Sequence, residues 1–481
     1  MLTTANARAT LLPLCLALAC GSDGDPAEPG DDGADGADDG AVATDEGSAD
    51  DEGSEGGAPL SGINWHENIA PLVVPSCVGC HREGGIAPFS FETYEGTAPL
   101  AEAIVAAVES GSMPPFAVGE TDECQPKHGW KDDLRLSDDD KQMLRDWAAD
   151  GAPEGDAALA AEIPAVPETT LEDADQSLRM RGSTTIDGSD DQFVCYSLDP
   201  ELTEDGFIEA IQVVPGNDKI VHHVLIYVDD SGDSAELADK DGAFDCSGGS
   251  LSGNLVGAWA PGALPNRMPP DAGMLIPAGA RLVMNVHYHP TGIAAEVDDA
   301  TGIDIDWTDE RPFFAARLNL VGNAGEAEEL QPGPNDENGV EFFIPAGEEA
   351  HTESMRFVVP DGFPQLRVFS VGTHMHYAGV DMIFGVERPN GDNECLIQTP
   401  TYQFQWQRSY TYDADINLVP RLESGDTLTM RCTYNNTMGN PSLAESLQQA
   451  GKDAPEDIYL GDETNDEMCL GVVGTVFPNV F

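Results

Sequence analysis

Short apolar runs alternate with turn residues along the chain from about residue 180 onward. Valine, isoleucine and aromatic residues dominate these runs, and glycine, proline, asparagine and aspartate separate them. The clearest runs are residues 207–214, 219–228, 280–290, 365–386 and 426–434. This spacing is typical of antiparallel strands joined by short turns. We therefore predict two tandem, antiparallel, jelly-roll-like β-sandwich domains, at residues 181–305 and 306–481.

The pattern of residues 60–157 is different and favours helices. Near the end of this segment, Ser137 is placed to cap a helix and Asp140 completes a capping box. The apolar side of that helix is formed by Met143, Leu144 and Trp147. We predict a small all-α domain at residues 60–157, joined to the β region by a proline- and alanine-rich linker at residues 158–180.

The N-terminal segment has the composition of a targeting signal followed by a tether. A single Arg8 precedes an apolar run that ends at Cys20, which resembles a bacterial lipoprotein signal at residues 1–20. Residues 21–59 are acidic and contain very few large apolar side chains, so we expect a disordered linker there. The expected location is the bacterial cell envelope, with Cys20 lipidated as the only membrane attachment. A plain secretory signal, giving a secreted protein, is the alternative.

The charge balance excludes some partners. The chain of 481 residues contains 22 basic and 87 acidic residues, for a formal net charge of −65. A surface this acidic repels nucleic acid and anionic lipid, so neither is an expected partner. The length also exceeds what one hydrophobic core usually holds, which agrees with several domains.

The cysteines fall into two groups if the protein leaves the cytoplasm. Cys15 is removed with the signal and Cys20 is acylated, which leaves eight of the ten cysteines in an oxidising compartment where disulfides persist. Two of the eight, Cys77 and Cys80, precede His81 in a C-x-x-C-H motif, which is typical of c-type haem attachment. Each thiol can bond one haem vinyl group while the imidazole binds the iron.

An electron-carrying haem needs a sixth ligand. Met113 lies in a loop stiffened by Pro114 and Pro115, which is the usual context for an axial methionine. Met143 is the alternative, but it falls on the apolar face of the predicted helix. Residues 62–155 resemble a mono-haem cytochrome c, which implies covalently attached haem c, iron and electron transfer.

Histidines occur in groups within the predicted strands. His222 and His223 are adjacent, and two H-x-H pairs follow: His287 with His289, and His374 with His376. Residues two apart on a strand face the same side, so each H-x-H can present two imidazoles to one metal ion. Adjacent histidines face opposite sides unless a bulge or a strand end intervenes. One such histidine alone is normally a packed or surface residue, but three groups in one region favour a metal site.

The order of these motifs carries a family resemblance. H-H, V-H-Y, H-x-H and a C-terminal D-E-M-C follow one another between about residue 185 and residue 481. This order resembles the copper type II, ascorbate-dependent monooxygenases, the group of peptidylglycine α-hydroxylating and dopamine β-monooxygenases. The resemblance implies two sandwich domains that each hold one copper ion. The implied ligands are His222, His223 and His287 for an electron-transferring copper, and His374, His376 and Met468 for the copper that binds oxygen and substrate.

The ligand types agree with that chemistry. Imidazole holds copper in both oxidation states, whereas the soft thioether of Met468 favours Cu(I). Met430 and Met438 are weaker candidates for the sulfur ligand, and Met375 is expected in the core because it faces away from its two neighbouring histidines. His289 shares a face with His287, so only the resemblance selects His287.

The resemblance also implies disulfides. It pairs Cys432 with Cys469 beside the ligand methionine, and Cys195 with Cys246 near the H-H strand. Such bridges would restrain the loops that carry the ligands. Cys124 and Cys395 have no counterpart in the family, and a bridge from the haem domain to the second copper domain is one interpretation of them.

Departures from the family pattern bear on the substrate. Where the peptide-amidating members hold a substrate carboxylate with arginine, asparagine and tyrosine, this chain has Gly372, Leu470 and Val472. A peptidylglycine substrate is therefore not expected. The predicted function is hydroxylation of a C–H bond in a small organic substrate by O2. Electrons would reach the first copper from the fused haem, an ascorbate-like reductant or a redox protein.

Two other classes of function fit parts of the pattern. One is a non-catalytic haem and copper electron-transfer or copper-binding lipoprotein, which keeps the metal sites without turnover. The other is a zinc-dependent hydrolase on a β scaffold, because H-x-H also suits zinc. Neither a nucleophile triad nor a P-loop motif occurs in the sequence to suggest different chemistry.

Overall fold

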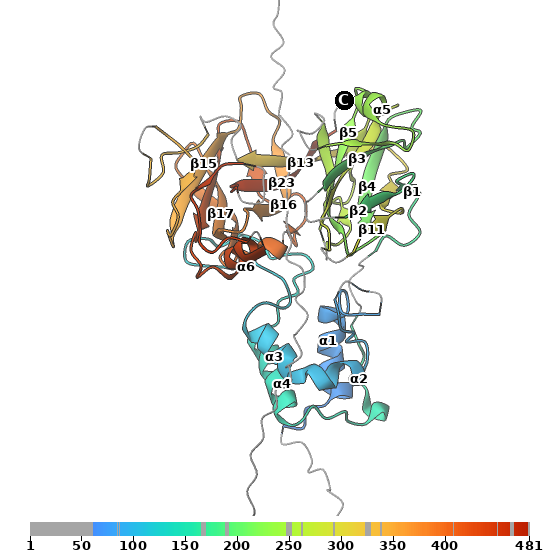
Figure 1. Ribbon diagram of the computed structural model, residues 1–481, viewed down its shortest axis with the longest axis vertical. Helices are drawn as coiled ribbons and strands as arrows, with labels where there is room; N and C mark the ends of the chain where they lie inside the picture. Colours follow the sequence, from blue (N-terminus) through green and yellow to red (C-terminus); the bar gives the residue numbers. More distant parts are fainter. Residues whose placement is uncertain are drawn as a thin grey trace, which may run out of the picture.

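The structure is a computed structural model (Figure 1), in which a helical unit lies below two β-rich bodies. It describes residues 61–479 except positions 84, 86, 165–169, 188–191, 247–252, 261–262, 292–293, 323–328, 337–338, 407, 450 and 462–465. The predicted signal, the lipidation at Cys20 and the acidic linker lie outside the described residues. Within these residues, no helix has the length and apolar character needed to cross a membrane.

The N-terminal helical unit packs around its own core. Its elements are η1 (Trp65–Ile69), α1 (Ala70–Cys77), α2 (Tyr94–Thr97), η2 (Ala98–Leu100), α3 (Ala101–Glu109), α4 (Asp138–Ala149) and η3 (Ala157–Leu159). Trp147 and Leu144 of α4 are buried against η1 and α1, together with Ile69 and Val73. The capping box that the sequence predicts at the start of α4 is present. The Ser137 side chain accepts the backbone N–H of Asp140, and the Asp140 side chain accepts that of Ser137.

The remainder is mostly β-sheet with few helices, in agreement with sandwich domains. In the first β-rich body, a five-stranded sheet, ordered β6-β3-β10-β5-β7, faces one half of a ten-stranded sheet. The five strands are β6 (Ala243–Asp245), β3 (Gln192–Leu198), β10 (Arg281–Tyr288), β5 (Val221–Asp229) and β7 (Asn254–Trp259). The facing strands are β1 (Gln176–Arg179), β12 (Gly302–Trp307), β4 (Gly206–Val214), β8 (Asn266–Arg267) and β9 (Ala272–Ile276). Smaller elements are β2 (Thr184–Ile186), β11 (Glu296–Asp298) and α5 (Asp233–Leu237).

The second body is built in the same manner. A four-stranded sheet is ordered β15-β21-β17-β18, with bounds β15 (His351–Val358), β21 (Thr427–Tyr434), β17 (Gly379–Glu387) and β18 (Asn393–Thr399). It faces the other half of the ten-stranded sheet, formed by β13 (Phe314–Gly322), β23 (Leu470–Pro478), β16 (Leu366–His374), β19 (Ser409–Thr411) and β20 (Arg421–Leu422). The remaining elements are β14 (Phe343–Ile344), η4 (Phe404–Trp406), α6 (Pro441–Gln449) and β22 (Ile458–Tyr459).

The two bodies share a sheet, which the sequence pattern did not indicate. Strands β9 and β13 pair in parallel through Phe314 with Ala272 and Ala315 with Gly273. This short parallel contact makes one ten-stranded sheet from the two halves. Strand β12 also runs across position 305, where the sequence analysis placed the boundary between the two sandwiches.

Strand β5 is buried along all nine of its residues. Val224 and Ile226 pack in the core of the first body, while Leu225 and Tyr227 pack in the core of the second. The continuous apolar run of β5 follows from burial on both faces, since a strand with one wet face would alternate apolar and polar residues. Two adjacent histidines in this run are therefore both removed from solvent.

A long connection between α3 and α4, residues 110–137, lies on the second body, and we call it the strap. Its Cys124 forms a disulfide with Cys395 of β18, which confirms the bridge that the sequence analysis considered between these domains. The Gly119 N–H donates to the carbonyl of Gln398 at 3.1 Å. Figure 1 shows this connection rising from the helices towards the second body.

Both disulfides implied by the family resemblance are present. Cys432 of β21 is bonded to Cys469, which directly precedes β23, and Cys195 of β3 is bonded to Cys246. Strand β10 separates β3 from β5, so the second bridge restrains the sheet beside His287 and does not touch the H-H strand itself.

Candidate metal centres

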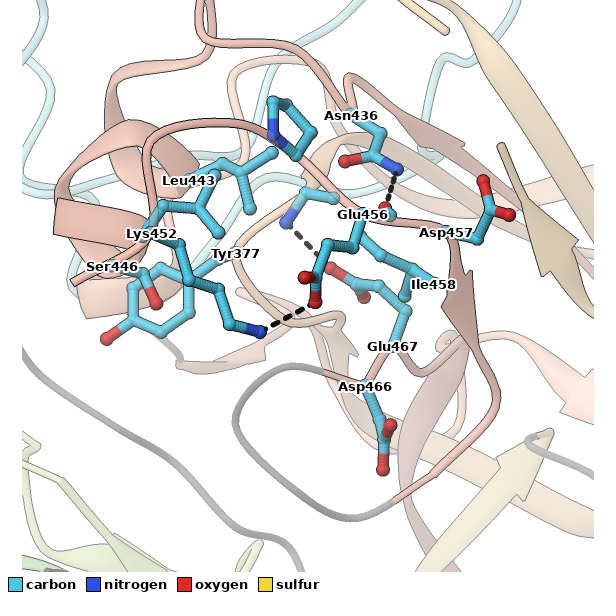
Figure 2. Close-up of a pocket in the computed structure, with 13 residues that line it drawn as sticks. Tyr377, Asn436, Leu443, Ser446, Lys452, Glu456, Asp457, Ile458, Asp466 and Glu467 are labelled. Carbon is cyan, nitrogen blue, oxygen red and sulfur yellow. Dashed lines mark hydrogen bonds and ion pairs between the residues drawn. The ribbon is translucent and has the colours of Figure 1, made fainter. Parts of the chain in front are cut away.

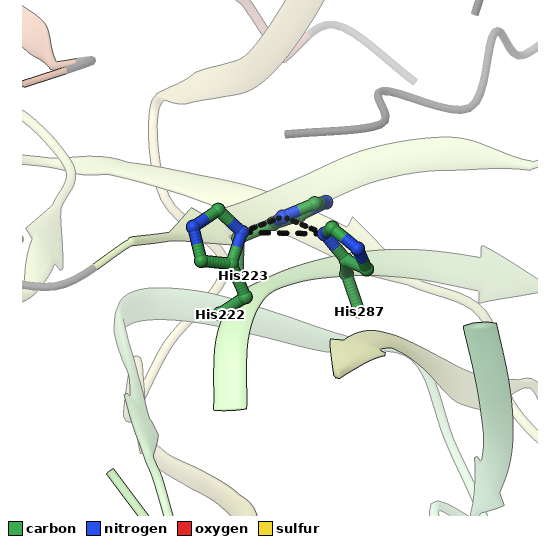
Figure 3. Close-up of side chains that lie close together, drawn as sticks. All are labelled: His222, His223 and His287. Atoms are coloured by element: carbon green, nitrogen blue, oxygen red, sulfur yellow. Dashed lines mark hydrogen bonds between the residues drawn. The ribbon is translucent and has the colours of Figure 1, made fainter. Parts of the chain in front are cut away.

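Three imidazoles from β5 and β10 converge at one point (Figure 3). The Nδ1 atoms of His222 and His223 lie 3.3 Å apart, those of His222 and His287 lie 3.2 Å apart, and those of His223 and His287 lie 3.1 Å apart. All three residues are buried. Their ring nitrogens form a group compact enough to hold one metal ion.

A β-bulge at His222 makes this convergence possible. The pairing of β10 with β5 passes from His287 opposite His223 directly to Tyr288 opposite Val221, so His222 is the extra residue. A bulge turns an additional side chain towards the face that it would otherwise miss. This confirms the irregularity that two adjacent histidines require in order to share a face.

The spacing of the nitrogens favours a central cation. A neutral imidazole nitrogen is either a donor or an acceptor, so among three mutually close nitrogens at least one pair has the same role. A metal ion removes that conflict because it accepts all three lone pairs. Nitrogens bound tetrahedrally at about 2.0–2.1 Å from such an ion lie about 3.3 Å apart, which agrees with the distances given above.

His289 lies outside this group. Its backbone N–H donates to the carbonyl of Ile220 at 2.9 Å, and its ring centroid is 6.3 Å from that of His222. The ring of His287, in contrast, is stacked on Phe193 with centroids 4.4 Å apart. The geometry therefore selects His287 over His289, a choice that the sequence pattern alone left open.

The second H-x-H pair lies at the end of β16. His374 is the last residue of that strand and His376 follows in the turn to β17. Both are buried, and their ring centroids are 5.2 Å apart. The side chain of Met375 between them is fully buried in the core of the second body, as expected.

Met468 lies two residues before β23, which runs antiparallel to β16 with His374 opposite Leu470. The backbone N–H groups of Met468 and His376 both donate to Oε2 of Glu467. Met468 is fully buried, and its carbonyl accepts a hydrogen bond from the Tyr434 hydroxyl at 2.7 Å. Of the weaker sulfur candidates, Met430 is buried in the core and Met438 is 42 % exposed.

The tautomer of His376 is fixed by a backbone carbonyl. Its Nδ1 lies 2.9 Å from the carbonyl oxygen of Asp466. A carbonyl only accepts hydrogen bonds, so a neutral His376 donates from Nδ1 and carries its lone pair on Nε2. Metal-binding histidines are commonly oriented by this kind of contact.

Glu467 ties the two segments of this centre together, and the sequence analysis did not single it out. Its Oε2 accepts the backbone N–H groups of His376 at 2.7 Å and Met468 at 3.1 Å, and its Oε1 accepts that of Ala378 at 2.7 Å. Burial raises the pKa of this carboxyl to about 8, against the lowering effect of the backbone donors. Glu467 lines a small cavity of about 40 Å³, and Glu456 and Lys452 line the same cavity (Figure 2). The acidic residue of D-E-M-C was the available signal.

The C-x-x-C-H motif begins at the end of α1. The N–H groups of Cys80 and His81 donate to the carbonyl of Cys77 at 3.2 and 2.9 Å, and both cysteines are free thiols. Burial raises the pKa of the Cys77 thiol to about 12. His81 stacks on Phe91 with centroids 4.3 Å apart.

Met113, the predicted axial methionine, lies in the same unit, at the start of the strap. Its N–H donates to the carbonyl of Ala107 near the end of α3 at 3.2 Å. Met143, the alternative, packs against the core of the helical unit from α4. This placement agrees with a packing role for Met143.

The three positions that depart from the family pattern lie together beside the H-x-H pair. Gly372 is paired with Val472 and His374 with Leu470 across β16 and β23. Leu470 is buried. These positions therefore place no cation and no hydrogen-bonding side chain next to the histidines.

Comparison with known proteins supports part of this assignment. Residues 350–473 match the family model described as copper type II ascorbate-dependent monooxygenase, C-terminal domain. The matched segment contains His374, His376 and Met468, while the three histidines of the first centre precede it. No curated protein matches the chain.

Solved structures show only distant likenesses. The major capsid protein P2 from bacteriophage PM2 is 8 % identical, with a TM-score of 0.24, over 63 % of this chain and 98 % of that one. A structure of infectious bursal disease virus Gx strain is 10 % identical, with a TM-score of 0.17, over 66 % and 74 % of the two chains. At such scores the likenesses carry no argument about fold or function.

Proposed function

We propose that the protein is a copper-dependent monooxygenase that hydroxylates a C–H bond of a small organic substrate with O2. The observation that carries the proposal is the family match at residues 350–473, because it covers the H-x-H pair and Met468. The backbone contacts of Glu467 support it, since they hold both parts of that ligand set to one carboxylate.

In this proposal His374, His376 and Met468 hold the copper ion at which oxygen and substrate meet. The bound copper supplies the electron that activates oxygen for attack on the C–H bond. The thioether of Met468 favours the cuprous state, which is the state that reacts with oxygen. The carbonyl of Asp466 orients His376 so that Nε2 faces the metal, and burial of all three ligands excludes bulk water from the reacting atoms.

His222, His223 and His287 hold a second copper ion whose role is electron transfer. Three imidazole nitrogens bind both Cu(I) and Cu(II). A centre that is repeatedly oxidised and reduced needs ligands of this kind. The nitrogen spacing supports this assignment, and stacking on Phe193 holds His287 in place during the redox change.

The helical unit is proposed to be a cytochrome c-like domain with one covalent haem. Cys77 and Cys80 would form the two thioether bonds, His81 and Met113 would be the axial ligands, and the haem would carry single electrons. The Nδ1 of His81 lies 3.2 Å from the carbonyl of Phe89, an arrangement that leaves Nε2 for the iron. Attachment to the cell envelope through Cys20 belongs to the same proposal.

The substrate is expected to lack a carboxylate handle. A glycine and two apolar residues occupy the positions where a carboxylate clamp would lie, namely Gly372, Leu470 and Val472. Without a cation there, a charged substrate group would be desolvated without compensation. A small neutral organic molecule is the class that suits this surface.

The test is hydroxylation under labelled oxygen. The chain is expressed with haem maturation, loaded with copper, reduced and supplied with ¹⁸O2 and a panel of small neutral substrates. We expect one labelled oxygen atom in a hydroxylated product, detected by mass spectrometry. Copper and haem without substrate-dependent oxygen uptake would instead indicate an electron-transfer protein, and zinc without copper would indicate a hydrolase.

A further inference from the structure

The first residues of the strap contact a short segment of the second body, residues 404–406 and 408–411. The Nη1 of Arg408 donates to the carbonyl of Pro115 at 3.3 Å. The ring of Phe116 meets that of Tyr410 edge-on with centroids 5.0 Å apart, and the Arg408 guanidinium lies 6.0 Å from the Phe116 centroid. These contacts begin two residues after Met113.

The same segment also contacts β16 and the H-x-H pair at its end. Ser409 and Tyr410 of β19 pair with Gly372 and Val371 of β16, the strand that ends at His374. A Cβ atom at Gly372 would lie 3.0 Å from the carbonyl of Arg408, so glycine permits this close approach. At the start of the segment, Phe404 of η4 lies against His376 with ring centroids 5.9 Å apart.

Residues 404–406 and 408–411 therefore lie between the strap residues that follow Met113 and the histidines at the end of β16. The strap is held in this position by its disulfide to β18 and by the stacking of Trp130 on Tyr412.

From these contacts we propose that residues 404–406 and 408–411 are the route by which the haem of the helical unit reduces the copper held by His374, His376 and Met468. The inference rests on the haem and copper assignments proposed above. One electron crosses the contact: the haem iron is oxidised from Fe(II) to Fe(III), and the copper is reduced from Cu(II) to Cu(I). A one-electron donor of the redox-protein or ascorbate class restores the haem. This route does not pass through His222, His223 and His287, whereas the sequence alone suggested that the haem feeds that centre.

The test measures which centre oxidises the haem. In the oxidised, haem- and copper-loaded chain, the haem is photoreduced without oxygen, and its reoxidation is followed at the visible α-band. The double variant His222→Ala/His287→Ala is expected to keep the rapid reoxidation of the parent chain. His374→Ala/His376→Ala is expected to lose it. The opposite pattern would overturn the proposal.

A second set of variants tests the contact itself. Arg408→Leu combined with Phe116→Leu should slow reoxidation by about tenfold or more, equivalent to about 1.4 kcal/mol in the barrier. Lys127→Ala is the matched control: it removes a different strap contact, at 2.7 Å to Glu394 of β18, and should leave the rate unchanged. Equal rates in the contact variant and the control would contradict the route.

The metal and haem contents of the same samples distinguish a failure of the proposed route from a failure of the proposed function. A parent chain that contains haem and copper but shows no difference between the two histidine variants would overturn the route alone. A parent chain without haem or copper would overturn the proposed function, and the route with it. The cupric signal in electron paramagnetic resonance identifies the copper that is reduced as the haem reoxidises.

Discussion

His376 and Met468 donate their backbone N–H groups to the same atom, Oε2 of Glu467. The two residues are far apart in the sequence and belong to one proposed copper site. A buried carboxylate that accepts several backbone N–H groups fixes the positions of those groups, because each lost hydrogen bond would leave a buried polar group unsatisfied. The relative placement of the H-x-H turn and the methionine thus depends on this side chain.

Substitution of Glu467 should therefore disturb one metal centre selectively. In Glu467→Gln one oxygen becomes an amide NH2 that cannot accept the backbone N–H groups, and we expect about 1–3 kcal/mol lower stability. Copper at the His374 centre should bind more weakly, while copper at the His222 centre stays bound. Titration with Cu(I) and thermal unfolding measure the two effects.

Glu456→Gln is the matched control for that experiment. Glu456 borders the same small cavity but is exposed and pairs with Lys452 at 2.8 Å. Exposed ion pairs contribute roughly 0–1 kcal/mol, so this variant should bind both copper ions normally. Equal losses in the two variants would mean that Glu467 has no specific positioning role.

Replacement of Met468 by leucine should separate copper binding from oxygen reactivity. The two side chains have similar volumes, so the fully buried site should lose less than about 1.5 kcal/mol of stability. Without the thioether the cuprous state is less favoured, and oxygen uptake should fall far more than the copper content. Met438→Leu, at an exposed position, is the control. Normal oxygen uptake in Met468→Leu would remove Met468 from the ligand set.

The strap disulfide should stabilise the docking of the helical unit. Cys124 and Cys395 close a loop with a sequence separation of 271 residues, and removal of a native disulfide typically costs about 2–5 kcal/mol. We expect the Cys124→Ser/Cys395→Ser double variant to be cleaved within the strap by limited proteolysis faster than the parent chain. Cleavage at the parent rate would show that the noncovalent contacts of the strap suffice.

Asp229, at the end of β5, gives a pH dependence that can be checked. Burial acts to raise the pKa of this carboxyl, but hydrogen bonds from Ser231, Ser234 and Gly232 outweigh it and lower the pKa from 3.8 to about 2. The folded state therefore binds the proton less tightly than the unfolded state. The resulting stability is present above about pH 4 and is lost as the pH falls towards 2.

The variant Asp229→Asn cannot make this ionisation-dependent contribution. In urea unfolding between pH 3 and pH 5, the parent chain should lose stability more steeply than the variant as the pH falls. A constant difference between the two proteins over this range would show that the carboxyl of Asp229 has an ordinary pKa.

Much of the site could be predicted from sequence because strand geometry constrains it. Two adjacent histidines in an apolar run can share a metal only at an irregularity, and a bulge lies at His222. The Cys432–Cys469 bridge and the grouping of Met468 with the H-x-H pair were instead predicted from the family resemblance, and the bridge is present. The choice between His287 and His289 needed the structure, since both lie on one face of β10 and its continuation.

Other features depend on contacts that leave little trace in a single sequence. The parallel pairing of β9 with β13 involves only two residue pairs, so it produces no recognisable periodic pattern in the sequence. Glu467 is one of 87 acidic residues in the chain, and apart from its place in the D-E-M-C motif only its burial distinguishes it. The docking of the strap had one sequence signal, a cysteine without a family partner, and Arg408 and Tyr410 had none.

The central claim is that the chain holds copper at two separate centres, one of them with a sulfur ligand. Copper, zinc and iron are counted in the purified, reconstituted chain, and X-ray absorption at the copper edge is recorded for the reduced protein and for Met468→Leu. The account predicts two copper ions and one haem iron per chain, with a copper–sulfur contribution that is lost in the variant. Zinc in place of copper, or a copper–sulfur contribution that survives the substitution, would contradict it.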